Sequence, residues 1–100
     1  MPKSRRKTAL LGLSKVIAEE NARFGIRCNT IAPGIVKTHF SEALWKDPNQ
    51  EKAILKMVPL KRFGESEEIA GVAAFLCSDD SSYVTGESIV AAGGMVASRI

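Results

Sequence analysis

The segment Gly25-Ile-Arg-Cys-Asn-Thr-Ile-Ala-Pro-Gly34 decides the fold class of this 100-residue chain. Its middle part, residues 26–32, contains isoleucines, a cysteine and a threonine, a short run typical of a β-strand. Pro33 and Gly34 then stop the strand, because this pair favours a turn. Gly25 is suited to the position that directly follows a helix. A strand with helical sequence on both sides predicts a parallel α/β sheet.

The sequence before this strand predicts a long helix over residues 8–24. Its apolar side chains recur every three or four residues, which is the spacing of one helix face. These apolar side chains form a stripe along the helix, and the stripe is so wide that it predicts burial of the helix on two sides. Gly12 lies inside the helix, and close packing is expected there because glycine costs a helix about 1 kcal/mol against alanine. The stripe comprises Leu10, Leu13, Ile17 and Phe24, widened by Leu11, Val16, Ala18 and Ala22.

Two short helical pieces are predicted over residues 38–58. The second begins at Asp47-Pro48, where the aspartate can cap the helix and the proline suits its first position. Pro59 ends this piece, because a proline disfavours helix at the residue before it. A loop over residues 59–64 is expected to follow.

A further helix is predicted from Ser66, with acidic residues near its positive end. Ile69, Val72, Ala73 and Leu76 give it a full apolar face. Residues 78–82 form a predicted loop, and residues 87–92 a second strand that Gly93-Gly94 ends. Strand, helices and strand make one parallel crossover. A two-stranded sheet is rarely stable alone, so the chain is predicted to be an end portion of a larger α/β fold.

Composition narrows the functional classes. The chain is 45% hydrophobic and 25% charged, as in globular proteins, and no apolar run approaches the roughly 20 residues that span a bilayer. Four of its 14 bases lie in the first seven residues, and residues 8–100 hold ten bases against eleven acids. Nucleic-acid binding is therefore not expected, because it needs bases along a face. Cys28 and Cys77 are too isolated for a metal site or a predicted disulfide, so we expect a reducing, intracellular protein.

Five motifs are spaced along the chain: residues 7–15 (KTALLGLSK), 25–38 (GIRCNTIAPGIVKT), 62–70 (RFGESEEIA), 75–79 (FLCSD) and 83–90 (YVTGESIV). Together they closely resemble the short-chain dehydrogenase/reductase family. The resemblance implies a doubly wound, Rossmann-like parallel sheet, of which this chain would supply the last two strands and three to four helices. It covers residues 7–100 and implies one partial domain over residues 1–100, with residues 1–6 as a basic tip outside the family pattern. Within the family it is closest to the peroxisomal NADPH-dependent carbonyl (retinal) reductases.

The resemblance implies a catalytic Tyr-x-x-x-Lys motif, a catalytic serine and a glycine-rich phosphate loop. Lys7 falls on the lysine position, which in the family binds the nicotinamide ribose and lowers the tyrosine pKa. Lys3 stands where the tyrosine should be, and the sequence has no G-x-G-x-x-G pattern. Tyr83 belongs to a different motif and is not expected to replace the catalytic tyrosine. We therefore expect this chain alone to bind little NADP(H) and not to reduce a carbonyl.

The nicotinamide-binding segment of the family is present. The resemblance assigns cofactor contacts to Pro33, Gly34, Ile35 and Thr38, through backbone groups and one hydroxyl. The alternative is that Pro33-Gly34 merely stops a strand and that Thr38 caps a helix.

The next residues fall in the family's variable substrate lid. Phe40, Leu44 and Trp45 would make that lid apolar, which suits a hydrophobic carbonyl substrate. The alternative is that they are ordinary core or partner contacts. His39 has no metal-ligand partner nearby in sequence and is expected to face solvent or to be satisfied locally.

The two ends of the chain carry the remaining expectations. Ser98, Arg99 and Ile100 resemble the C-terminal Ser-Lys-Leu peroxisomal signal, although an arbitrary tail is the alternative. Residues 2–7 resemble a basic nuclear-import stretch, which we interpret instead as a new or truncated start. The location is therefore expected to be peroxisomal or cytoplasmic. The family assembles into dimers and tetramers, so a second copy or a full-length relative is the expected partner, and a non-catalytic interaction module is the alternative function.

Overall fold

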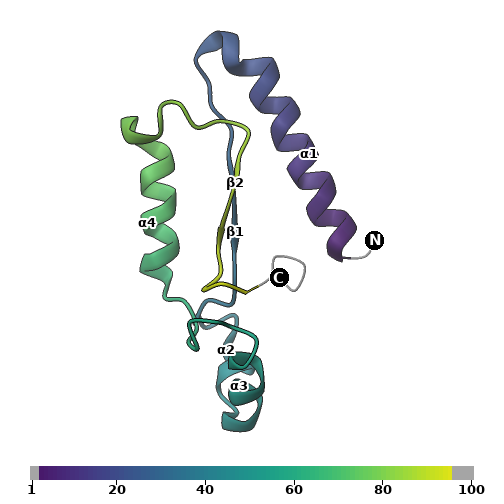
Figure 1. Cartoon of the computed structure of the whole chain (residues 1–100), viewed down its shortest axis with the longest axis vertical. Helices are drawn as coiled ribbons and strands as arrows, with labels where there is room; N and C mark the ends of the chain where they lie inside the picture. Colours follow the sequence, from purple (N-terminus) through teal and green to yellow (C-terminus); the bar gives the residue numbers. More distant parts are fainter. Residues whose placement is uncertain (1–2, 96–100) are drawn as a thin grey trace. The chain divides into compact units, whose positions relative to one another are not determined.

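The computed structural model describes the backbone of residues 3–95 and the side chains of residues 8–95. It confirms the predicted α/β class, with four α-helices and two strands among these residues (Figure 1). The described residues form two compact units, one from residues up to 31 with 73–89, the other from residues 32–72 with those from 90 on. The elements are α1 (Lys3–Asn21), η1 (Ala22–Phe24), β1 (Thr30–Pro33), α2 (Glu42–Trp45), α3 (Pro48–Leu55), α4 (Ser66–Cys77), η2 (Asp79–Ser81) and β2 (Ser88–Ala91), where η is a 3-10 helix.

Strands β1 and β2 pair in a two-stranded parallel sheet, far apart in sequence but side by side in Figure 1. The Thr30 N–H donates to the Glu87 carbonyl at 2.9 Å, and the Gly34 N–H donates to the Ala91 carbonyl at 2.9 Å. The same sequence offset at both bonds fixes the parallel register.

Strand β1 begins later than predicted, at Thr30 and not at residue 26. Residues before it hydrogen-bond to a loop and not to a strand ladder. The Cys28 N–H donates to the Thr85 hydroxyl at 3.2 Å, and the Cys28 carbonyl accepts from the Gly86 N–H at 2.8 Å. The loop partner therefore delays the ladder, which the residue composition alone does not reveal.

Helix α1 differs from the prediction in its burial. Among its described side chains only Ser14 and Ala18 are buried, and the expected two-sided burial is not observed. The leucines of the stripe remain 38–56% exposed, because few described residues lie against them. Gly12 has open space around it, so the close packing expected there was wrong. The helical segment ends as predicted, with Gly25 in the left-handed region at φ 72°.

In the first unit, the Arg27 guanidinium links several segments by hydrogen bonds. It donates to the Ser81 hydroxyl at 3.1 Å and to the Val84 carbonyl at 3.2 Å. It also donates to the carbonyls of Leu76 at 2.9 Å and Ser78 at 3.4 Å. The predicted loop after α4 contains the short helix η2, and Arg27 thus ties the strand entrance to the end of α4 and to η2.

In the second unit, two short helices occupy the stretch where they were predicted. Asp47 caps α3, since its carboxylate accepts from the Asn49 N–H at 3.0 Å with Pro48 at the first helical position. The buried apolar residues of this unit are Val58, Phe63 and Met95. None of the helices in the described part of the chain is long and apolar enough to cross a membrane.

Candidate functional site

The candidate site is the loop that leaves β1, and Gly34 fixes its path. A Cβ at this position would lie 2.7 Å from the Ala92 Cα and 2.8 Å from the Ala92 Cβ. Only glycine leaves room for the two backbones to approach so closely. Pro33 before it is exposed at the end of the strand, while Gly34 and Ile35 are half-buried.

After Gly34 the loop pairs briefly with a second segment of the same unit. Val36 and Gly64 form an isolated parallel bridge. The Lys37 N–H donates to the Gly64 carbonyl at 2.8 Å, and the Gly64 N–H donates to the Ile35 carbonyl at 3.0 Å. Within the residues that the structure describes, the Ile35 N–H itself has no hydrogen-bond partner. This loop therefore presents a backbone donor whose position is held on both sides.

Thr38 and Ser41 form a reciprocal pair at the turn before α2. The Thr38 N–H donates to the Ser41 hydroxyl at 3.0 Å, and the Ser41 N–H donates to the Thr38 hydroxyl at 3.2 Å. The Ser41 hydroxyl also donates to the Val36 carbonyl. The Thr38 hydroxyl donates to the Ser41 oxygen at 3.3 Å, which leaves Thr38 Oγ1 one further lone pair to accept a hydrogen bond. The Thr38 hydroxyl thus closes the turn before α2 and can still accept a cofactor contact, but Thr38 is not the cap of α2, because Ser41 directly precedes that helix.

The predicted lid residues do not share one environment. Phe40 is fully exposed, at 100%. Leu44 and Trp45 are half-buried on α2. The Trp45 indole N–H donates to the Thr38 carbonyl at 3.2 Å, and the Lys37 ammonium lies 4.9 Å from the centre of the indole ring. The side chain of Trp45 is therefore folded back onto the candidate cofactor loop.

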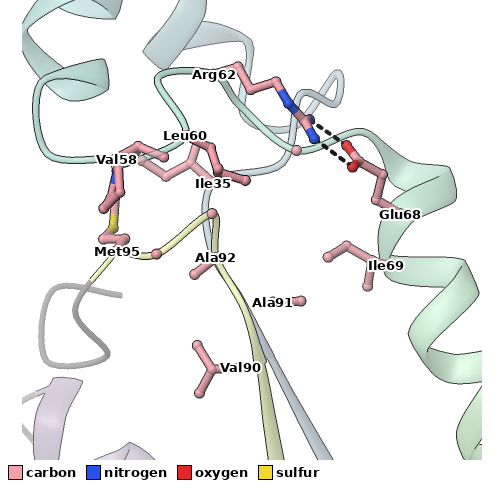
Figure 2. A pocket seen from close by; sticks show the side chains of 14 residues that line it. Ile35, Val58, Leu60, Arg62, Glu68, Ile69, Val90, Ala91, Ala92 and Met95 are labelled. Carbon is pink, nitrogen blue, oxygen red and sulfur yellow. Dashed lines mark hydrogen bonds and ion pairs between the residues drawn. The ribbon is translucent and has the colours of Figure 1, made fainter.

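A hollow of about 610 Å³ lies within the second unit, beside the carboxyl end of β2 (Figure 2). Ligands of open α/β sheets bind outside the carboxyl ends of their strands. Ile35 of the candidate site lines this hollow together with aliphatic side chains and the Arg62–Glu68 pair. The principal apolar lining residues are Val58, Leu60, Ile69, Val90 and Met95.

The charged pair at this hollow is a two-pronged ion pair, drawn with dashed lines in Figure 2. The two Arg62 nitrogens donate to the two Glu68 carboxylate oxygens at 2.7 and 2.8 Å. Glu68 also accepts from the Glu65 N–H at 3.0 Å. The hydrogen bonds from Arg62, followed by the bond from the Glu65 N–H, lower the pKa of Glu68 to about 2. Because each charge is satisfied by the other, the lining as a whole suits an apolar group better than an ion.

The remaining predicted residues contribute no described geometry to this site. Lys7 lies on α1, and its side chain is outside the described residues, as are Ser98, Arg99 and Ile100. Tyr83 is fully exposed in the loop after η2. His39 is exposed, and its Nδ1 lies 3.4 Å from a Glu42 carboxylate oxygen that sequence reasoning had not linked to it. The described residues contain no cluster of side chains that could hold a metal ion.

Sequence reasoning also missed two residues that shape the site. Ser41 orders the Thr38 turn, and Gly64 bridges Val36. The Thr-x-x-Ser spacing of 38 and 41 was a detectable signal, because a hydroxyl residue often caps the N–H three residues later. Gly64 carried no such signal, since its partner lies 28 positions away in the chain.

Comparisons with known proteins show which sequences this chain is similar to. A family model described as enoyl-(acyl carrier protein) reductase matches residues 4–96. The dehydrogenase/reductase SDR family member 4 of Oryctolagus cuniculus is 53% identical over 88 residues, which cover 88% of this chain and 34% of that protein. The chain spans about a third of the length of the curated relatives it matches.

The fold of the chain is also similar to parts of solved dehydrogenase and reductase structures. A 4-hydroxyisoleucine dehydrogenase complexed with NADH superposes with a TM-score of 0.87 at 32% identity, covering 91% of this chain and 37% of that one. The NADPH-dependent reductase YwfH, involved in bacilysin biosynthesis, superposes with a TM-score of 0.80 at 38% identity, covering 89% and 37%. The strand pair and its helices thus occur within larger nucleotide-dependent oxidoreductases.

Proposed function

Because this chain belongs to the short-chain dehydrogenase/reductase family, we propose that residues 33–38 form the nicotinamide edge of an NADP(H)-dependent carbonyl reductase. The observation that carries this proposal is the Ile35 N–H, which has no hydrogen-bond partner among the described residues although the bridge at Val36 holds its loop in place. One relative in the solved structures is complexed with NADH and another is NADPH-dependent.

The chemistry of the edge fits a carboxamide. A nicotinamide carboxamide offers a carbonyl acceptor and an amino group with two donors. The Ile35 N–H supplies the complementary donor, and Thr38 Oγ1 supplies the complementary acceptor. When bound, the cofactor would supply a hydride to a carbonyl substrate or take one from an alcohol. The Ile35 backbone N–H and the Thr38 hydroxyl would hold and orient the ring end. The apolar residues Phe40 and Leu44 would favour a hydrophobic carbonyl substrate.

We further propose that the 100 residues by themselves do not catalyse this reaction. Lys3 occupies the position where the family pattern has its tyrosine, and an ammonium group cannot act as the phenol acid. The sequence also has no glycine-rich turn to seat a pyrophosphate. Steady oxidation of NADPH with a diketone by the pure chain would contradict this proposal.

The test of the nicotinamide edge uses the two halves of the cofactor separately. Nicotinamide mononucleotide is titrated into the ¹⁵N-labelled chain, and adenosine 2′,5′-bisphosphate serves as the control ligand. We expect the mononucleotide to shift the amide resonances of Ile35 and Thr38, with weak affinity because only a few hydrogen bonds hold it. The adenosine half should leave both resonances in place. Equal shifts from both halves, or none from the mononucleotide, would refute the assignment.

A matched pair of variants sharpens this test. Thr38→Ser keeps the hydroxyl, and Thr38→Val replaces it with a methyl group of similar size. Thr38→Ser should retain the shift at position 38, whereas Thr38→Val should lose it. If the Thr38 hydroxyl made no contact with the ligand, Thr38→Val would keep the same ligand-induced shift at position 38 as Thr38→Ser.

A second candidate function, a non-catalytic interaction module, is favoured by the exposed apolar face of α1. Leu10, Leu13 and Val16 are 49–56% exposed, and an apolar patch that faces water favours association. The proposed partner is a second copy of this chain or a full-length relative. Size-exclusion chromatography with light scattering tests the idea, and a stable monomer at high concentration would contradict it.

The proposed location is the peroxisome, on the basis of Ser98-Arg99-Ile100 at the C-terminus. Arginine keeps the cation and isoleucine keeps an aliphatic end, relative to the Ser-Lys-Leu signal. A fluorescent reporter that carries the last dozen residues should become punctate and coincide with a peroxisomal marker. A diffuse signal would contradict the proposed peroxisomal location.

A further inference from the structure

Trp45 touches both residues at the end of the candidate cofactor edge. Its indole N–H donates to the Thr38 carbonyl at 3.2 Å, and its ring face lies 4.9 Å from the Lys37 ammonium. The Thr38 carbonyl also accepts from the Ser41 N–H at 3.2 Å. Trp45 thus contacts two successive residues, Thr38 through its indole N–H and Lys37 through the face of its ring.

Helix α2 needs such a contact to keep its place. It is four residues long, and isolated helices of fewer than about 12 residues are marginal in water. Its charged contact pairs the half-buried Glu42 with the exposed Lys46 at 3.0 Å, and pairs open to solvent on one side contribute little. The hydrogen bonds of Ser41 hold the start of α2 to the Thr38 turn, and the half-buried indole of Trp45 adds a side-chain contact from the end of α2 to the same turn.

The same contact occupies the single hydrogen-bond donor of the indole. An indole N–H that is bonded to the Thr38 carbonyl cannot also donate to a bound substrate. The fully exposed Phe40 makes no comparable contact with the loop, and its ring is free to meet an apolar ligand. The residues that the family pattern groups as one lid therefore divide into two kinds.

We propose that Trp45 is a positioning residue, which holds the Thr38 turn in register for the nicotinamide carboxamide and whose indole N–H does not donate to substrate. This inference rests on the proposed function for its ligand, and on the observed contacts for its local effect. Loss of the indole N–H should loosen the turn at Thr38 while the bridge between Val36 and Gly64 continues to hold Ile35. Trp45 is therefore expected to affect the ligand contact at Thr38 and not the ligand contact at Ile35.

The test compares Trp45→Phe, which keeps an aromatic face over Lys37 but loses the N–H donor, with Phe40→Leu as the matched control. Amide hydrogen exchange is measured on the full chain. Exchange at Ser41 and Leu44 should accelerate about three- to tenfold in Trp45→Phe, which is the net contribution of one hydrogen bond. Exchange in α4 should stay unchanged, which distinguishes local opening from unfolding. Phe40→Leu should match the wild type.

Fluorescence provides a second measurement, since Trp45 is the only tryptophan in the chain. Acrylamide should quench the wild-type emission more slowly than that of N-acetyltryptophanamide, because the indole is half-buried. Equal quenching rates, or Ser41 exchange that is the same in Trp45→Phe and in the wild type, would overturn the local role.

The mononucleotide titration then separates this inference from the proposed function. In Trp45→Phe the ligand-induced shift at Thr38 should shrink while the shift at Ile35 persists. Equal shifts in the variant and the wild type would overturn the positioning role. If the wild type shows no shift at either residue but its exchange depends on Trp45, the nicotinamide assignment fails and the indole contact with Thr38 stands as a structural one.

Discussion

Replacing Gly34 by alanine tests the closest backbone approach in the candidate site. The added Cβ would meet the Ala92 Cα at 2.7 Å, the Ala92 Cβ at 2.8 Å and the Ala92 carbonyl oxygen at 3.3 Å. Two of these three atoms belong to the backbone, which cannot rotate away as a flexible side chain could. Gly34 is not among the glycines with positive φ, so the backbone conformation itself would suit alanine.

The expected loss of stability follows from these two facts. Overpacking a close contact costs about 1–3 kcal/mol, and the upper end applies because the obstacle is mainly backbone. Replacing glycine by alanine also stabilises the folded state by about 0.4–1 kcal/mol, because alanine restricts the unfolded chain and the backbone conformation here suits it. Gly34→Ala should therefore lower the free energy of unfolding by about 2 kcal/mol.

Urea unfolding followed by circular dichroism measures this loss, with two glycines of the same chain as matched controls. A Cβ at Gly64 would meet its nearest atoms at 3.8 Å, so Gly64→Ala should change stability little. A Cβ at Gly71 on α4 would meet nothing within 4 Å, so Gly71→Ala should stabilise the chain by up to about 1 kcal/mol. If Gly34→Ala unfolds at the same urea concentration as Gly64→Ala, the steric reasoning is refuted.

Two further predictions concern Arg27 and the ion pair between Arg62 and Glu68. Arg27→Lys keeps the charge but loses the planar fork that reaches four acceptors, so it should destabilise the chain by about 2 kcal/mol in the same urea assay, and an unchanged midpoint would show that these bonds contribute little. The pKa of Glu68 is lowered from 4.5 to about 2 by Arg62, so its stabilising contribution is present above about pH 4.5 and is lost as the pH falls toward 2. The stability difference between the wild type and Glu68→Gln should therefore shrink over this range, and a difference that stays constant from pH 6 to pH 2 would contradict the assigned pKa.

Local sequence signals predicted most of the helices. The cap at Asp47 and the proline after it place α3, and the apolar spacing from Ile69 to Leu76 identifies α4. Gly25 ends the first helical segment, because its left-handed φ is costly for other residues. These signals depend on interactions between residues that are close in the chain, so they can be predicted from residue types and their spacing.

Burial was the main error, and its cause is not local. The apolar stripe of α1 predicted burial on two sides, yet only Ser14 and Ala18 among the described side chains of this helix are buried. A periodic stripe shows which face favours an apolar neighbour, but it cannot show whether the neighbour is part of the same 100 residues. The late start of β1 has a similar cause, because the loop around Gly86 takes the bonds that a strand partner would otherwise make.

For the candidate site, the sequence by itself determined the residue types: a strand stopped by Pro33-Gly34, a threonine at position 38 and aromatic residues in the segment after it. The family pattern in these residues also determined which cofactor to consider. The tertiary structure alone decided how they are used, with Gly34 against Ala92, Val36 paired with Gly64, and the Trp45 indole on the Thr38 carbonyl. The physical reason is that a hydrogen bond or a steric contact depends on the distance between atoms in space. For residues far apart in the chain, that distance is set only when the intervening segments have folded.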